Sequence, residues 1–232
     1  MDKYYHFTSF NNLPSIMKCG LVPQTGFRCY SIQDNSYGVF LSKGIDKAIQ
    51  MFAFMLSYYN KVTCIEGDKV IQECLKEIEE ENKKNPYFQN ILNINECNDT
   101  INRINTIRAC GSFDRYLGEN MCYLSIEGIT PNEESHPSNC RYDGRILPDK
   151  IKLVGLRNIN TNECTYNLYS VLSYFMHIYP MNVVLKSVSG NNHNDIKKLY
   201  EYKNNNFNLN NYELIEVPLI NSYNYQKIIT KN

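Results

Sequence analysis

The residues best suited to chemistry lie in two short segments of the N-terminal part of the chain. The first segment contains His6, Thr8 and Ser9, and the second contains Phe40 and Ser42. An imidazole and small hydroxyl groups form hydrogen bonds with sugar hydroxyls and amides, and an aromatic ring stacks on a flat ring. The two segments therefore predict a site for a ligand that combines these groups. A histidine between two aromatic residues also fits a purely structural role, so both interpretations stay open at this stage.

The elements expected around these residues place each segment at the end of a strand. Residues 4–8 are aromatic, β-branched or histidine, which predicts one strand, and residues 38–42 predict another. A helix is expected from about Asn12 to Cys19, and Gly20 is expected to end it. A buried helix is expected after Ile45, because apolar residues recur there at helical spacing. Both strands thus end on hydrogen-bonding side chains.

The remainder of the chain mixes helical and strand patterns. An amphipathic helix is expected at about 68–84, and short helices joined by polar loops are expected at 85–118. Further strands are expected at 120–126, 151–156, 183–185 and 212–217, with helices at 166–178 and 195–202. This irregular order favours an α+β fold over a doubly wound parallel sheet.

Composition and charge exclude several classes of protein. The chain has 24 Lys and Arg against 24 Asp and Glu, so no overall field attracts nucleic acid or anionic lipid, which leaves only a local basic patch open. No stretch approaches the roughly 20 apolar residues that span a bilayer, and we expect no membrane partner. The N-terminus lacks the organisation of a secretory signal. The expected location is therefore cytoplasmic, or inside a target cell after delivery by another route.

Cysteine and histidine spacing gives no indication of a metal site. The nine cysteines form no C-x-x-C pair, and we expect reduced, mostly buried thiols. His136, His177 and His193 have no partner at metal-ligand spacing. Cys19 precedes a helix-ending glycine, which is the wrong end of a helix for stabilising a thiolate. Neither a metal site nor a cysteine protease is predicted, and the phosphate-binding loop, the dinucleotide fingerprint and the hydrolase elbow are missing from the sequence.

Four short motifs, taken in their order and spacing, resemble the ADP-ribosyltransferase superfamily, in the histidine-bearing branch that includes the poly(ADP-ribose) polymerases. The opening also resembles DNA-modifying toxins of the DarT kind and RNA 2′-phosphotransferases, which share this fold. The motifs cover roughly the first quarter of the chain: Tyr5-His6-Phe7-Thr8-Ser9, Leu13-Pro14-Ser15-Ile16, Gly20-Leu21-Val22-Pro23, and Val39-Phe40-Leu41-Ser42 with Ala48. The resemblance implies an α+β fold with split mixed or antiparallel sheets and flanking helices. It implies a NAD-binding domain, expected at 1–159. Residues 160–232 match no part of the family, and we expect them to form a C-terminal extension of unknown role packed on the same domain.

This resemblance assigns cofactor-binding roles to the two segments. It implies that His6, with Thr8 or Ser9, contacts the ribose and the amide of NAD. Phe40 is assigned to the nicotinamide face and Ser42 to packing beside it. In the family the first motif reads H-G-T-S, and a tyrosine more often stacks on nicotinamide. This chain has a phenylalanine in place of both the glycine and the tyrosine.

Three arginines are candidates for contacts with anionic groups. Arg28, in the loop between the two segments, suits the pyrophosphate of NAD, because a guanidinium donates charge-assisted hydrogen bonds to phosphate oxygens. Arg108 and Arg115 are candidates for contacts with a substrate. Each of the three also fits an ordinary surface arginine.

The catalytic carboxylate implied by the resemblance is a glutamate at the start of a late strand. It contacts a ribose hydroxyl and assists the departure of nicotinamide. Residues 140–151 resemble that strand and its following turn, which puts Asp143 near the catalytic position. Glu127, Glu133 and Glu134 are alternatives, and each also fits a surface carboxylate.

The function expected from these observations is mono-ADP-ribosyl transfer from NAD to a protein or nucleic-acid acceptor, as in a toxin or effector. NAD is then a co-substrate, and no metal is required. Two alternatives stay open. One is a catalytically inactive protein of this fold that acts as a binding or inhibitor module, and the other is a NAD-dependent RNA 2′-phosphotransferase.

Overall fold

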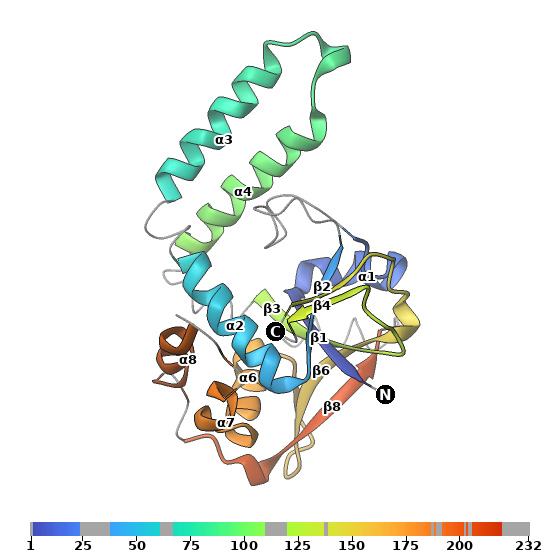
Figure 1. Cartoon of the computed structure of the whole chain (residues 1–232), viewed down its shortest axis with the longest axis vertical. Helices are drawn as coiled ribbons and strands as arrows, with labels where there is room; N and C mark the ends of the chain where they lie inside the picture. Colours follow the sequence, from blue (N-terminus) through green and yellow to red (C-terminus); the bar gives the residue numbers. More distant parts are fainter. Residues whose placement is uncertain are drawn as a thin grey trace. The chain divides into compact units, whose positions relative to one another are not determined.

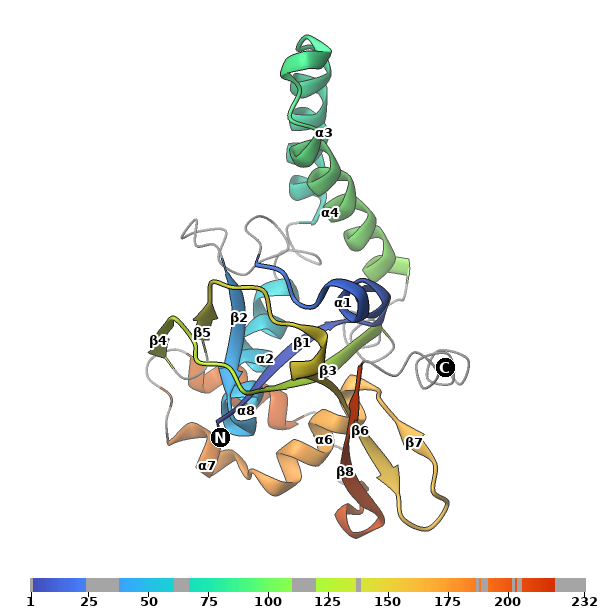
Figure 2. The same ribbon diagram turned by 90° about the vertical axis from the view of Figure 1, so that its right-hand side faces the viewer.

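The computed structural model describes residues 2–23, 38–60, 67–109, 120–136, 139–186, 188, 192–201, 203 and 206–219. Its chain contacts divide into two compact units, whose elements are labelled in Figures 1 and 2. The first unit contains the described residues of 1–23, 38–54 and 117–232. The second contains the described residues of 55–116. Arg28 and Arg115 lie outside the described residues.

The first unit is built on an antiparallel sheet. Its strands follow the order β4-β5-β2-β1-β3-β6-β7, and β8 also pairs with β6. Every pairing between these strands is antiparallel. The strands are β1 (Lys3–Ser9), β2 (Val39–Lys43), β3 (Met121–Glu127), β4 (Glu133–His136), β5 (Asn139–Tyr142), β6 (Ile151–Asn158), β7 (Cys164–Thr165) and β8 (Tyr212–Pro218). The expected mixture of helices and strands is confirmed, and the assignment to an ADP-ribosyltransferase arrangement stays a prediction.

One face of the sheet packs against helix α1 (Leu13–Cys19). The core on this face includes Tyr4 of β1 together with Leu13 and Ile16 of the helix. Because side chains alternate along a strand, His6 and Thr8 point to the same face as Tyr4. We call this the α1 face.

Gly20 fixes the end of α1 against the loop before β6. Its φ is +72°, and a Cβ at this position would lie 2.0 Å from the carbonyl oxygen of Ile146. Glycine is therefore required, because any side chain would collide with the backbone and strain a left-handed conformation. Leu21 and Ile146 then exchange backbone hydrogen bonds of 2.9 Å in both directions.

The other face of the sheet is covered by α2 (Ile45–Asn60) and α6 (Leu168–Ile178). Tyr5 of β1 meets Phe175 of α6 with ring centroids 5.7 Å apart. Phe7 meets Phe52 of α2 in an edge-to-face contact at 5.9 Å. Such pairs stabilise beyond their buried area by about 0.5–1.5 kcal/mol each. We call this the α2–α6 face.

The segment after residue 160 is built into the sheet unit. β8 pairs with β6 from Tyr212 opposite Asn158 to Pro218 opposite Lys152. Helices α7 (Met181–Leu185) and α8 (Asn192–Glu201) precede it. The strand expected at 183–185 is wrong, because the N–H groups of both valines donate to the carbonyl of Pro180 and start a helical turn. The two valines are β-branched and favour a strand by themselves. Here the helical turn that begins at Pro180 decides the conformation instead.

The second unit contains a helical hairpin formed by α3 (Gly67–Asn82) and α4 (Ile91–Ala109), with a 3₁₀ turn at Pro86–Phe88 between them. The two helices run side by side in both views (Figures 1 and 2). The amphipathic helix expected at about 68–84 is confirmed as α3. The short helices expected at 85–118 are wrong over residues 91–109, where one helix of 19 residues forms. Its polar asparagines weaken the helical pattern, while the partner helix buries Cys97 and Ile104.

Candidate functional site

The junction of β1 and β2 brings the two sequence segments together. The two strands pair only at Tyr4 opposite Lys43 and at Tyr5 opposite Ser42. On its other side, β1 pairs with β3 from Lys3 to Ser9. Beyond Tyr5, β1 therefore keeps its ladder with β3 but has none with β2. We call this opening the β1–β2 fork.

His6 spans the fork. Its Nδ1 lies 2.9 Å from the carbonyl oxygen of Phe40. Because a carbonyl only accepts hydrogen bonds, Nδ1 carries the proton and Nε2 keeps its lone pair as an acceptor. Burial lowers the pKa of His6, and the hydrogen bond to the Phe40 carbonyl opposes this shift. The ring is thus neutral at neutral pH, with Nε2 ready to accept a hydrogen bond from a hydroxyl.

Thr8 and Ser9 hold the turn that leads from β1 into α1. The Thr8 hydroxyl accepts a hydrogen bond of 3.1 Å from the side chain of Asn12. The Ser9 hydroxyl accepts one of 3.2 Å from the backbone N–H of Asn11 and caps the turn. Thr8 shares the α1 face with His6, whereas Ser9 points to the opposite face. Asn12 was expected only as the start of a helix, so its contact with Thr8 is new.

Phe40 and Ser42 point away from the face of His6. Ser42 lies opposite Tyr5 in the ladder, and side chains of opposed antiparallel residues share a face. Phe40, two residues earlier, lies on that same α2–α6 face. The structure therefore brings the backbone carbonyl of Phe40 to His6, but directs the Phe40 ring to the other side of the sheet.

Asp143 is joined to the fork strands through Arg141. Arg141 lies opposite Phe40 in the ladder between β2 and β5. Its Nε donates a hydrogen bond of 2.7 Å to the carboxylate of Asp143, and its guanidinium forms an ion pair of 3.1 Å with Glu133. Sequence reasoning missed Arg141. Its signal was an arginine two residues before an acidic residue at a strand end.

Glu127 belongs to a different cluster of charges. Its carboxylate pairs with Lys3 at 3.0 Å and with Lys152 at 3.1 Å, and both lysines also pair with Glu216. The hydrogen bond from Lys3, followed by that from Lys152, lowers the pKa of Glu127. Glu127 lies opposite Lys3 in the ladder, so its side chain is on the opposite face from His6.

Two of the other charged candidates lie elsewhere. Arg108 belongs to the helical hairpin, where its guanidinium pairs with Asp68 at 2.8 Å. Glu134 lies in β4, but its side chain is outside the described part of the structure.

Two buried hydroxyls of β3 lie opposite β1 residues at the last β1–β2 pair and just beyond it. Tyr123 lies opposite Phe7, and Ser125 lies opposite Tyr5. Among the described residues, neither hydroxyl has a hydrogen-bond partner. Burial alone raises the pKa of Tyr123, so the phenol stays protonated. Nothing in the strand pattern of the sequence distinguished these two residues.

Searches of the described residues for other kinds of site give two negative findings. No group of three or more His, Cys, Asp or Glu side chains in that part of the chain is arranged to hold a metal ion. None of the described helices is long and apolar enough to cross a membrane.

Comparisons with known proteins give no match. No protein-family model, no curated protein and no solved structure matches it. The assignment of function therefore rests on the residues themselves.

Proposed function

We propose that the β1–β2 fork binds the nicotinamide riboside part of NAD, and that the protein transfers ADP-ribose from NAD to a macromolecular acceptor. The observation that carries this proposal is the early end of the β1–β2 ladder, with His6 held across the opening by the Phe40 carbonyl. The ordered sequence motifs support the choice of NAD as the ligand.

The backbone of β1 supplies the groups that a carboxamide needs. Gly44 donates its N–H to the carbonyl of Lys3 at 3.0 Å, so the backbone groups of Lys3 face β2. In an antiparallel ladder the facing direction alternates, which turns the N–H and C=O of Phe7 toward β2 as well. The ladder with β2 has already ended there. A nicotinamide carboxamide, which donates through N–H and accepts through C=O, is complementary to this pair.

His6 adds selectivity for a sugar. The neutral ring offers Nε2 as an acceptor, and a ribose hydroxyl is a donor of matching kind. Thr8, on the same face, has a hydroxyl that already accepts from Asn12 and therefore has its own hydrogen to donate. A ligand with an amide and a vicinal diol thus fits two sets of groups on β1: the Phe7 backbone, which faces β2, and the side chains of His6 and Thr8 on the α1 face.

The proposed reaction breaks the bond between C1′ of the ribose and the nicotinamide nitrogen. The bonding electron pair leaves with nicotinamide, and C1′ passes through an oxocarbenium-like state that a carboxylate stabilises. An acceptor nucleophile then adds to C1′ and loses its proton to a base or to water. Asp143 is the first candidate for the carboxylate, because Arg141 connects it to β2, and Glu127 is the second.

The test is incubation of the purified protein with labelled NAD and a cell lysate, followed by separate protease and nuclease treatment. We expect label on a protease-sensitive or nuclease-sensitive fraction, and at subsaturating NAD we expect His6→Ala to reduce it about tenfold. His177→Ala is the matched control, because the Nδ1 of His177 lies 2.7 Å from the Ser173 carbonyl of its own helix and its ring packs on Phe207, neither of which belongs to the fork. Equal labelling by wild type and His6→Ala would refute the proposed role of the fork.

A second candidate function is a binding module of this fold without catalysis. It is favoured by the ion pairs that occupy both candidate carboxylates, Asp143 with Arg141 and Glu127 with Lys3 and Lys152. Neither carboxylate shares the α1 face with His6. NAD binding without turnover, in the presence of lysate, would select this candidate. Turnover that Asp143→Asn or Glu127→Gln abolishes would remove it.

A further inference from the structure

Two cysteines face each other inside the helical hairpin, and the proposed function uses neither of them. Cys74 lies in α3 and Cys97 in α4, and their side chains are 2% and 0% exposed. Both are free thiols, and they form a hydrogen bond with each other. One thiol from each helix is therefore in contact with the other. We call Cys74 and Cys97 the thiol pair.

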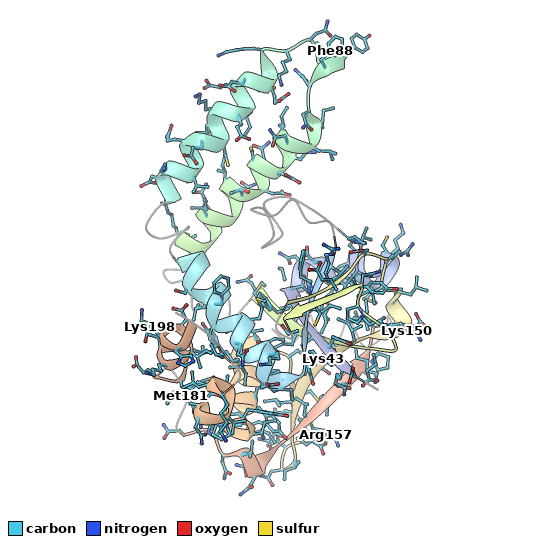
Figure 3. All side chains as sticks on the ribbon, viewed as in Figure 1. Lys43, Phe88, Lys150, Arg157, Met181 and Lys198 are labelled. Carbon is cyan, nitrogen blue, oxygen red and sulfur yellow. The ribbon has the colours of Figure 1, made fainter. Side chains whose placement is uncertain are left out.

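The register of the hairpin sets the two cysteines opposite each other. Near the turn, where Figure 3 labels Phe88, the N–H of Asn90 donates a hydrogen bond of 2.9 Å to the carboxylate of Glu81. Cys74 lies seven residues before Glu81, and Cys97 lies seven residues after Asn90. Seven residues make about two helical turns. Moving two turns away from the Asn90–Glu81 contact along both antiparallel helices therefore leads to the thiol pair.

The thiol pair supplies much of the buried interior of the hairpin. Among the described side chains of α3 and α4, the buried residues are Gly67, Cys74, Glu81, Cys97 and Ile104. Glycine has no side chain to bury, and Glu81 is a carboxylate. The fully buried apolar interior of this described part is thus one isoleucine and two thiols. Local opening requires less free energy where little apolar surface is buried, so we expect the two helices to separate more readily than the sheet core opens.

The surroundings of the thiol pair determine when it reacts. Burial raises the pKa of Cys74, and the hydrogen bond from Cys97 partly opposes this shift. Burial, followed by the sulfur of Cys74 and the carboxylate of Glu77, raises the pKa of Cys97 to about 12. Both thiols are therefore protonated at neutral pH while the hairpin is closed, and Cys74 is the first to ionise. Because the thiolate is the reactive form, reaction waits until the helices separate.

We propose that Cys74 and Cys97 form a reversible disulfide that locks α3 to α4, with glutathione disulfide as the oxidant. The Cys74 thiolate attacks one sulfur of the oxidant, which forms a mixed disulfide and releases one glutathione thiolate. Cys97 then loses its proton to water, and its sulfur attacks the sulfur of Cys74 and displaces the second glutathione. The released thiolates take up the two protons. The thiol pair loses two electrons in total, and one glutathione disulfide becomes two molecules of glutathione.

The disulfide restricts the open hairpin more than the closed one. It closes a loop of 24 residues, counted from Cys74 to Cys97. A cross-link removes conformations of the separated helices that the closed hairpin does not use, so it favours the closed hairpin. Glu77 loses the hydrogen bond of 3.5 Å that the Cys97 thiol donates, but it keeps one of 3.2 Å from the side-chain amide of Asn93. Oxidation therefore leaves this carboxylate with a donor.

The test is incubation of the full-length protein with mixtures of glutathione and glutathione disulfide at different ratios. Free thiols are then blocked with N-ethylmaleimide, and the protein is digested and analysed by mass spectrometry. We expect a linked peptide that contains Cys74 and Cys97 under oxidising ratios, and we expect dithiothreitol to remove it. The unfolding temperature, followed by circular dichroism, should be at least about 5 °C higher for the oxidised than for the reduced protein.

Cys74→Ala and Cys97→Ala should each abolish both the linked peptide and the rise in unfolding temperature. Cys164→Ala is the matched control, because Cys164 is exposed and belongs to the sheet unit. It should keep the linked peptide and the rise. In the native wild type, N-ethylmaleimide should modify Cys164 at least about tenfold faster than Cys74, because Cys74 reacts only when the helices separate.

Three results would overturn the proposal. The first is the absence of the linked peptide at every glutathione ratio, and the second is linkage of Cys74 or Cys97 mainly to another cysteine. The third is a disulfide that forms without raising the unfolding temperature, which would refute the lock. The comparison of oxidised with reduced wild type decides these points even where an alanine variant does not fold.

Discussion

The two sides of β1 behave differently, although one strand supplies both. Toward β3 the ladder includes every residue from Lys3 to Ser9, and toward β2 it includes only Tyr4 and Tyr5. The β3 side of β1, which we call the closed side, contributes buried apolar side chains, such as Leu124 opposite His6. The β2 side, which we call the open side, contributes a histidine and backbone polar groups. The β3 side thus fixes β1 in the sheet, while the β2 side leaves exposed the groups that we propose to bind NAD.

The largest expected effect is on stability, and it comes from the closed side. Leu124→Ala removes a fully buried side chain from the core on the α1 face. We expect the free energy of unfolding to fall by about 2–5 kcal/mol, from lost burial and the cavity that remains. Urea denaturation followed by circular dichroism measures this change. A loss below about 1 kcal/mol would show that the closed side does not fix β1 in the sheet.

The second-largest expected effect is a loss of NAD turnover when Asp143 is replaced. Asp143→Asn removes the charge while Arg141 keeps its ion pair with Glu133. We expect NAD turnover to fall about a hundredfold or more, because a preorganised charge that stabilises the transition state is lost.

Glu127→Gln is the comparison variant for Asp143→Asn. Lys3 and Lys152 keep Glu216 as a partner, so stability should change by less than about 1 kcal/mol. Initial rates with labelled NAD measure both variants. A larger loss of turnover for Glu127→Gln than for Asp143→Asn would reverse the assignment of the two carboxylates.

His6→Ala tests the open side with a smaller effect. We expect NAD affinity to fall about tenfold, because the Nε2 acceptor for a ribose hydroxyl is lost. Calorimetric titration of wild type, His6→Ala and the control His177→Ala measures it. Because no ladder pair depends on this side chain, the loss in stability should be well below that of Leu124→Ala. Unchanged affinity for NAD would place the ligand elsewhere.

The pH dependence of NAD binding follows from the same ring. The pKa of His6 is lowered in the folded protein by burial, so the unfolded chain takes up the proton first as the pH falls. Stability is therefore full above the ordinary histidine pKa of about 6.5 and decreases as the pH falls through the folded value. Binding that requires the neutral ring should persist below pH about 6.5 and then disappear. A His6 titration by NMR at or above the ordinary value would contradict this.

The smallest effect concerns the hydroxyl of Tyr123. Tyr123→Phe removes a buried donor that has no partner among the described residues. Stability should stay within about 1 kcal/mol of wild type, or increase slightly, because no hydrogen bond is lost. Thermal unfolding measures the change. A loss above about 2 kcal/mol would reveal a bound group on this hydroxyl.

Local sequence signals predicted most of the elements of the sheet unit. The strand patterns at β1, β2, β3, β6 and β8 gave the correct type of element, and Gly20 ends α1 as expected. Local patterns failed where neighbours decide the outcome. The valines of α7 favour a strand by themselves, but the Pro180 carbonyl accepts from them in a helical turn. The asparagine-rich α4 becomes one helix because α3 packs beside it.

The candidate site was predictable in residue type but not in orientation. The motifs selected His6 and Phe40, and the structure joins them through the Phe40 carbonyl rather than through its ring. Which face each side chain takes depends on strand register, and one sequence does not determine that register. The same limit hid Arg141, whose place opposite Phe40 follows from the pairing of β2 with β5.

The most direct test of the fork is a titration of the isotopically labelled protein with NAD, followed by NMR. We predict saturable shifts of the Phe7 amide and of the His6 ring resonances. The His177 ring should stay unchanged. Nicotinamide alone should shift the Phe7 amide but leave the His6 Nε2 resonance nearly unaffected, because it has no ribose. Saturable NAD binding that leaves Phe7 and His6 unperturbed, or the absence of any binding, would contradict the account.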